Sequence, residues 1–249
     1  MLAKRIITTL MLNNGILYRS KKFIPDYRYT LNFIDMWSVD EVVLLDITRN
    51  LNFESEEKKN FFNEMNKISK NSYIPLAVGG GIRKLKHIET LLKNGADKII
   101  INSIALEDIN FINLAAKEFG TQCIVVSIDI KYENKKFNLM KNYGKQISKY
   151  NVLEYIQIVQ EKNAGEIFLQ SVDRDGSLLG YNLDILEHVK EKIKVPLIVS
   201  SGAGNWSHVK DVLNKDYVSG ASLTNIYHFT EKSIKNLKHT IKDTIYIRE

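Results

Sequence analysis

Short runs of apolar and β-branched residues alternate along the chain with longer stretches of helical period. Continuous apolar character, as opposed to strict alternation, is typical of parallel strands covered on both faces. Runs of this kind occupy residues 5–12, 41–47, 75–79, 97–102, 123–130, 166–172, 196–201 and 217–223. Between them the helical spacing is clearest before Gly120 and after Thr230. Eight strands alternating with helices predict an α/β fold, a single (β/α)8 barrel over residues 1–249; an open doubly wound sheet is the alternative.

The chain also repeats itself at about half its length. The segment IPLAVGGGIRKLKHIETLLKNGADKIIINS from Ile74 parallels VPLIVSSGAGNWSHVKDVLNKDYVSGASLT from Val195, an offset of 121 residues. DEVVLLDIT from Asp40 echoes GEIFLQSVD from Gly165, an offset of 125. A repeat of this length predicts two similar (βα)4 halves, about 1–120 and 121–249, related by a pseudo-twofold axis. Equivalent loops of the two halves are then expected to do equivalent jobs.

Composition sets several classes of function aside. Lysine and arginine total 35 against 29 acidic residues, a mildly basic balance that suits phosphorylated substrates. The lysines are dispersed, so no nucleic-acid partner is expected. A single cysteine, Cys123, excludes a disulfide framework, and the histidines lack ligand spacing, so neither a metal nor another cofactor is expected. The short apolar start and the lack of any long apolar run predict a cytoplasmic protein without a membrane partner.

Two glycine-rich turns lie at repeat-equivalent places, VGGGI at 78–82 and SSGAG at 200–204. Each follows a strand and opens a helix, where backbone N–H groups can surround an anion. The residues expected to line the two sites are Gly80, Gly81, Asn102 and Ser103 in the first half and Gly202, Thr224 and Asn225 in the second. Two related sites predict a substrate with a phosphate at each end; glycines that merely permit tight turns are the alternative.

Carboxylates close two of the predicted strands. Asp129 ends the fifth run in SIDIK, where apolar neighbours would raise its pKa and suit it to general acid/base work. An ion pair with Lys131 or another neighbour is the alternative. Asp46 closes the second run in the same way and is expected to orient or assist. TLML at 9–12 aligns with SIDI at 127–130, which makes Met11 the counterpart of Asp129.

The loop SVDRDGSLLGYN at 171–182 is the densest acidic loop at a strand end. Asp173 and Asp175 bracket Arg174 there, and such a loop could bind substrate hydroxyls while the Gly176 amide supports a phosphate. Arg174 pairing with its neighbours to fasten the turn is the alternative. The lysine-rich segment 131–151 is expected to be a solvated hairpin flap.

Charged residues also mark the beginnings of four predicted strands. These positions are Arg5, Glu41, Lys98 and Glu166. Two cations and two anions at one end of a barrel could form a charge-balanced ring around its axis. Ordinary salt bridges at strand starts are the alternative.

Taken together, these segments resemble the cyclase subunit (HisF) of imidazole glycerol phosphate synthase over essentially the whole chain. The matching motifs are MLAKRII, LDIT, VGGGI, GADK, SIDIK, AGEI and DRDG…GY. The resemblance implies a barrel enzyme, a lyase and cyclase without cofactor, that forms a heterodimer with a HisH-like glutaminase docked at the strand beginnings. Ammonia released there would cross a charged gate and the barrel to a bis-phosphorylated ribonucleotide.

The resemblance implies a role for individual residues of this sequence. The ammonia gate corresponds to Arg5, Glu41, Lys98 and Glu166. Phosphate contacts correspond to Gly81, Asn102, Ser103, Gly176 and Gly202, and a substrate contact corresponds to Asp175. Asp129 matches one of two catalytic carboxylates. Met11 stands in the place of the other.

Departures from the family pattern concentrate where cyclisation is expected. Cyclisation needs groups on both sides of the substrate to exchange protons, and the thioether of Met11 exchanges none at ordinary pH. Arg19 replaces a mobile-loop lysine, Ser201 a phosphate-loop glycine and Asn225 a small hydroxyl residue. Diverged HisF-like proteins share the apolar residue at position 11 and the pattern of FIPDY at 23–27. The resemblance associates that group with surface-polysaccharide biosynthesis.

Three functions therefore stay open at the level of sequence. The first is a working cyclase in which Asp46 or Asp175 partly compensates for Met11. The second is an ammonia-channelling partner that serves a HisH-like glutaminase and a sugar-amidating enzyme. The third is a scaffold that binds a phosphorylated metabolite without ammonia chemistry, which leaves the charged strand beginnings unexplained.

Overall fold

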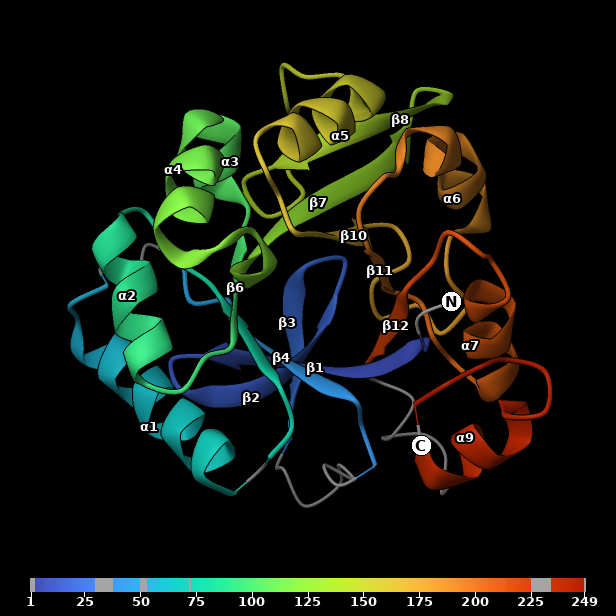
Figure 1. Cartoon of the computed structure of the whole chain (residues 1–249), viewed down its shortest axis with the longest axis horizontal. Coiled ribbons are helices and arrows are strands. Elements are labelled where there is room, and N and C mark those ends of the chain that lie inside the picture. The colour runs from blue at the N-terminus through green and yellow to red at the C-terminus, as the bar shows by residue number, and fades with distance from the viewer. Residues whose placement is uncertain (1–2, 30–37, 50–52, 72, 225–233, 249) are drawn as a thin grey trace.

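A computed structural model describes residues 3–29, 38–49, 53–71, 73–224 and 234–248 of the chain. Within these ranges eight parallel strands form a closed barrel with helices around it (Figure 1). The barrel strands are β1 (Arg5–Asn13), β4 (Glu41–Asp46), β5 (Leu76–Gly79), β6 (Lys98–Ile101), β7 (Ile124–Glu133), β10 (Glu166–Ser171), β11 (Leu197–Ser200) and β12 (Gly220–Leu223). Because β10 also pairs with β7, and β12 with β1, the sheet has no open edge, which confirms the barrel and rules out the open sheet.

Within the described residues, helices follow every barrel strand except β1 and cover the outside of the barrel. Their bounds are α1 (Glu56–Asn71), α2 (Leu85–Lys93), α3 (Ser103–Glu107), α4 (Asn110–Phe119), α5 (Val152–Glu161), α6 (Leu183–Val189), α7 (Trp206–Leu213) and α9 (Ile234–Ile241). Asn151, Asn182 and Asn205 precede α5, α6 and α7, and each side-chain oxygen accepts a backbone N–H of the first turn. Thr230, expected to open the last helix, lies outside the described residues. No described helix combines the length and the apolar character that crossing a membrane requires.

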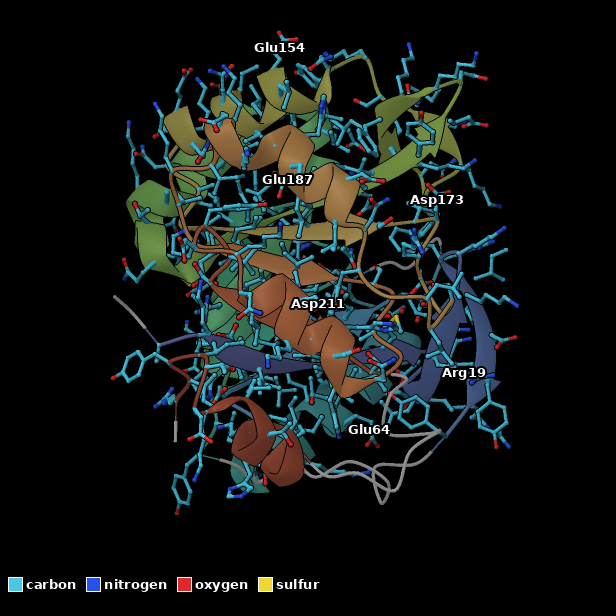
Figure 2. The ribbon with its side chains drawn as sticks, turned by 90° about the vertical axis from the view of Figure 1, so that its right-hand side faces the viewer. Arg19, Glu64, Glu154, Asp173, Glu187 and Asp211 are labelled. Atoms are coloured by element: carbon cyan, nitrogen blue, oxygen red, sulfur yellow. The ribbon has the colours of Figure 1, made fainter. Side chains whose placement is uncertain are left out.

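Two antiparallel excursions extend the barrel at the carboxyl ends of its strands. The first comprises β2 (Ile16–Lys21) and β3 (Ile24–Arg28) after β1, and the second β8 (Lys136–Lys141) and β9 (Gln146–Ile147) after β7. The second is the hairpin predicted for 131–151. The first was not predicted, although Asn14 and Gly15, both with positive φ (51° and 75°), form a two-residue turn typical of hairpins. In Figure 2 both excursions lie at the same end of the barrel, near the labelled Arg19 and Asp173.

Alternation along each strand divides the side chains into two sets. The larger apolar cluster lies between strands and helices, whereas a small cluster fills the barrel interior. The interior cluster comprises Ile7, Val43, Ala77, Ile100, Val125, Phe168 and Ile198. On β1, Arg5, Ile7, Thr9 and Met11 share the inward parity, so this one strand contributes to both ends of the interior.

The last predicted strand is shorter than expected. It was predicted over 217–223, but β12 begins at Gly220. The N–H of Val218 bonds the carbonyl of Lys215 at 3.0 Å, so the chain is still turning there and enters the parallel ladder only afterwards.

Candidate functional site

A cavity of about 320 Å³ opens at the carboxyl ends of the barrel strands. Its lining brings together eight of the residues singled out in the sequence: Met11, Asp46, Gly80, Gly81, Asn102, Ser103, Asp129 and Asp175. Four others, Arg19, Gly176, Gly202 and Thr224, are described but do not line it. Asn225 lies outside the described residues. The cavity therefore joins the first predicted phosphate loop to the predicted catalytic carboxylate.

Asp129 is buried on the inner face of β7 and is held by three neutral donors. Asn102 Nδ2 donates to Oδ2 at 3.0 Å, while Gln170 Nε2 and Ser127 Oγ donate to Oδ1 at 3.1 and 3.3 Å. Burial raises the pKa of Asp129 to about 6, although these hydrogen bonds oppose the rise. Lys131 pairs with Glu133 at 3.3 Å, so the alternative ion pair with Asp129 is not formed. A carboxyl group with this pKa can gain and lose a proton near neutral pH.

Met11 faces the same cavity from β1, beneath the β2–β3 hairpin. The hydroxyl of Ser20 lies 3.3 Å from its sulfur and also donates to Asp175 Oδ2 at 2.7 Å. The thioether is a weak acceptor and has no titratable proton. The position that mirrors Asp129 in the repeat therefore has no acid/base function of its own.

Asp175 connects the β10–α6 loop to the β2–β3 hairpin. Besides Ser20, the N–H of Phe23 donates to Asp175 Oδ2 at 2.9 Å, and the N–H of Lys22 donates to the Asp175 carbonyl at 3.2 Å. Burial raises the pKa of this carboxyl group as well. Gly176, at φ 68°, packs so close to the Ser20 carbonyl that a Cβ atom has no room. These contacts hold the hairpin over the site.

Arg174 and Arg19 both point to local partners. Arg174 Nη1 donates to the Leu179 carbonyl at 3.5 Å within its own loop, which agrees with the turn-fastening alternative. Arg19 pairs with Asp26 at 3.0 Å and lies over the Tyr27 ring on the hairpin. Figure 2 shows Arg19 at the hairpin, at the same end of the molecule as Asp173.

Asp46 has a counterion that the sequence reasoning missed. Lys58, from α1, lies 3.0 Å from Asp46 Oδ2, and both side chains are only 1% exposed. The same ammonium group donates to the Gly80 carbonyl at 3.2 Å and lies over the ring of Phe61. Burial lowers the pKa of Lys58, and Asp46 opposes that change. The available signal was the spacing of Lys58 with Phe61 and Met65, which places the lysine on the apolar face of α1.

Lys58 thereby fixes the turn that carries the first predicted phosphate loop. Gly80 and Gly81 have φ values of 110° and 70°. A Cβ atom on Gly80 would collide with the backbone of Asp46, so this turn can pass β4 only as glycine. Lys58 holds the Gly80 carbonyl, and the next residues of the turn, Gly81 to Arg83, line the cavity together with Ser103 at the start of α3.

At the opposite end of the barrel the four charged strand beginnings form a closed ring. Arg5 lies 2.7 Å from Glu41 and 3.0 Å from Glu166, and Lys98 lies 3.0 and 3.1 Å from the same two carboxylates. Glu41 is only 2% exposed. The interior apolar cluster, with Phe168 as its largest member, separates this ring from the cavity. Each cation of the ring thus contacts both acids, and each acid contacts both cations.

Comparison with known proteins identifies the family to which this chain belongs. The family model described as "Histidine biosynthesis protein" matches residues 11–233. The chain belongs to this histidine biosynthesis family. It is 36% identical over 247 residues to the imidazole glycerol phosphate synthase subunit HisF of Exiguobacterium, covering 97% of this chain and 94% of that protein. HisF of Chlorobium phaeobacteroides is 36% identical over 98% of this chain and 97% of its own length, and HisF of Chlorobium chlorochromatii 37% over 96% and 95%.

Proposed function

We propose that this member of the histidine biosynthesis family is the synthase subunit of a glutamine amidotransferase. It receives ammonia from a HisH-like glutaminase, with which it forms a heterodimer, and uses the ammonia at a phosphate-binding site in the cavity. The observation that carries this proposal is the closed ring of Arg5, Glu41, Lys98 and Glu166 at one end of a barrel whose other end holds a protonatable Asp129. Similarity to HisF subunits along nearly the whole chain supports it.

The barrel interior suits neutral ammonia. Its middle layer is apolar, and an apolar environment disfavours the ammonium ion far more than ammonia itself. Entry requires one side of the charged ring to separate. Lys98 and Arg5 are the more exposed members, at 18% and 17%, so their side chains have the most room to move.

The cavity suits a phosphorylated substrate. The Gly80–Gly81 turn and Ser103 offer backbone N–H groups and a hydroxyl for one phosphate. Gly202, Thr224, Asn225 and the Gly176 amide would serve a second. In a reaction of the imidazole glycerol phosphate synthase type, Asp129 exchanges protons during lysis and ring closure, and Asp46 positions the first phosphate turn through Lys58.

The environment of Asp129 favours a different acceptor for the ammonia, one that lies outside this chain. Met11 carries no exchangeable proton, Asp46 is bound by Lys58, and Asp175 accepts the Ser20 and Phe23 donors. A cyclase would have to work with a single carboxyl group. The alternative is a diverged channelling partner, with little cyclase activity, that passes ammonia to a sugar-amidating enzyme of surface-polysaccharide biosynthesis.

One set of assays separates these functions. Glutamine hydrolysis by the co-encoded HisH-like glutaminase is measured with and without this chain, and ammonia-dependent turnover of the bis-phosphorylated ribonucleotide is measured with the chain alone. Both acceptors predict that the chain stimulates the glutaminase. A turnover below about 10⁻³ of an ordinary cyclase, not rescued by Met11→Asp, rules out cyclisation.

Failure to stimulate the glutaminase, together with no effect of Glu166→Ala on any partner activity, contradicts ammonia handling altogether. The remaining function would then be a scaffold for a phosphorylated metabolite. Inorganic phosphate and the ribonucleotide, titrated separately, report on the cavity independently of the glutaminase.

A further inference from the structure

Exposed apolar side chains gather at the cavity end of the barrel. In the described structure, most of the large apolar side chains that are strongly exposed lie on segments following the carboxyl ends of the strands. Those with the clearest exposure on these segments are Leu179 (71%), Tyr27 (58%), Ile24 (56%), Tyr132 (53%), Ile147 (47%) and Tyr143 (41%). Large exposed apolar patches on a globular protein mark binding surfaces.

The segments that carry these side chains contact one another. The β2–β3 hairpin bonds the β10–α6 loop through Lys22 and Asp175, and the Tyr132 N–H donates to Asp173 Oδ2 at 2.7 Å. Gly144, between β8 and β9, packs against both Phe23 and Val172. Residues 16–28, 131–149 and 172–183 therefore form one continuous surface, here named the rim. In Figure 2 its strands project together from one end of the barrel.

The rim borders the mouth of the cavity. Phe23 and Pro25 of the hairpin and Tyr143 of the β8–β9 turn are among the residues that line the cavity. A body seated on the rim would therefore cover the opening, and ammonia arriving through the barrel would be kept from bulk water.

The charge of the rim is strongly one-sided. Its exposed cationic residues are Lys21, Lys22, Arg28, Lys135, Lys136, Lys141, Lys145 and Lys149, whereas its acids with strongly exposed side chains are Asp26 and Glu133, of which Glu133 pairs with Lys131. Such a surface attracts a partner of opposite charge. A small phosphorylated substrate would use the positive potential but would leave the apolar side chains of the outer rim uncovered.

We propose that the rim is the docking surface for a third protein, the acceptor of the ammonia, whose contacting face is acidic around an apolar centre. This proposal rests on the channelling alternative of the proposed function, in which ammonia leaves the chain for another enzyme, and not on use of the ammonia in the cavity. A protein acceptor accounts for three features together: the exposed apolar side chains of the rim, the positive charge around them and the cavity mouth between them. An anionic membrane would match the first two but would bring lipid, not an aqueous metabolite, to the mouth.

The test uses the complex of the full chain with its glutaminase. Each protein encoded by a neighbouring gene is purified and titrated against this complex, and binding is followed by analytical ultracentrifugation. Ile24→Glu and Leu179→Glu place charge on two rim segments, and Leu114→Glu is the matched control, since Leu114 is 49% exposed on α4, away from the rim. We expect one acidic protein to bind, each rim variant to weaken its Kd by about 30-fold, and the control to bind like wild type.

Two results overturn the docking proposal while the proposed function stands. One is that no neighbour-encoded protein binds with a Kd below about 10 µM although the glutaminase is stimulated. The other is binding that both rim variants leave unchanged. The complex could also sediment with vesicles of phosphatidylglycerol and phosphatidylcholine and fail to do so when it carries a rim variant. That result assigns the rim to a membrane and also overturns the docking proposal. If the wild-type chain does not stimulate the glutaminase, the proposed function itself is contradicted.

Discussion

Asp46 and Asp129 are buried at the same end of the barrel, yet their surroundings differ in kind. Asp46 lies 3.0 Å from the ammonium group of Lys58, whereas Asp129 is held by the neutral side chains of Asn102, Gln170 and Ser127. A buried carboxylate beside a fixed cation forms an ion pair that holds structure together. A buried carboxyl group among neutral donors keeps a pKa near 6 and can exchange a proton. Burial alone therefore does not show which carboxyl group can exchange a proton; the presence or absence of a counterion decides.

The largest expected effect comes from adding a second carboxyl group to the cavity, opposite Asp129. Met11→Asp places one opposite Asp129, and we expect ammonia-dependent turnover of the bis-phosphorylated ribonucleotide to rise by about 10²–10⁴ over wild type, the usual contribution of a general acid or base. Met11→Asn, which matches the size without the proton, is the control. Adding Asp129→Asn to Met11→Asp should abolish the gain. Equal rates for the Asp and Asn variants would show that the cavity has lost more than one carboxylate.

The next largest effect is expected from removing the counterion of Asp46. Lys58→Met keeps the volume and leaves the Asp46 carboxylate buried without a cation, which should lower the free energy of unfolding by about 3–5 kcal/mol. Lys59→Met is the matched control, because Lys59 is the next residue but its side chain is 66% exposed in a surface pair with Glu56. Urea unfolding measures both. Lys58→Met/Asp46→Leu should recover most of the loss; if Lys58→Met costs no more than Lys59→Met, the ion pair does not support the turn at Gly80.

A smaller effect is expected at the other end of the barrel. Glu41→Ala deprives Arg5 and Lys98 of a shared carboxylate, but both cations retain Glu166 and are 17–18% exposed, so we expect a loss of about 2–4 kcal/mol. Glu89→Ala provides the control, since Glu89 also bridges two lysines, Lys86 and Lys93, but on the surface of α2. Thermal or urea unfolding compares them. Similar losses would mean that the ring is no more than a set of surface salt bridges.

Sequence alone was sufficient for the barrel and for the general position of Asp129. The eight strands are nearly continuous in apolar character because both of their faces are covered, and that pattern is visible in a single sequence. Asp129 ends one of these runs, and the carboxyl ends of barrel strands share one face. The periodicity of the chain therefore locates the face on which chemistry is expected.

The partners of the two carboxylates could not be predicted in this way. Asn102, which follows β6, and Gln170 of β10 both reach Asp129, and whether they do depends on the stagger between neighbouring strands. Lys58 reaches Asp46 only because α1 packs its apolar face against β4, and a lysine in that position looks like a surface residue in a composition-based analysis. The β2–β3 hairpin was missed for a local reason, since β2 is only partly buried, β3 is mostly exposed, and neither strand has a strong apolar pattern.

The smallest expected effect tests Asp129 through the pH dependence of stability. Its folded-state pKa of about 6 lies above the ordinary value of 3.8, so the folded protein retains a proton that the unfolded chain has lost between these two pH values. Asp129 therefore costs nothing below about pH 4, destabilises the fold increasingly as the pH rises to 6, and exerts its full cost above that. Asp129→Asn should be less stable than wild type near pH 4, because the new amide must face donors that served a carboxylate, and should exceed its free energy of unfolding by about 1–2 kcal/mol at pH 7.5, where the buried charge of Asp129 costs more than that mismatch. Urea unfolding of both proteins at the two pH values measures this difference. A variant that is less stable than wild type at pH 7.5 would mean that Asp129 has a counterion like that of Asp46, and the distinction between the two carboxylates would fail.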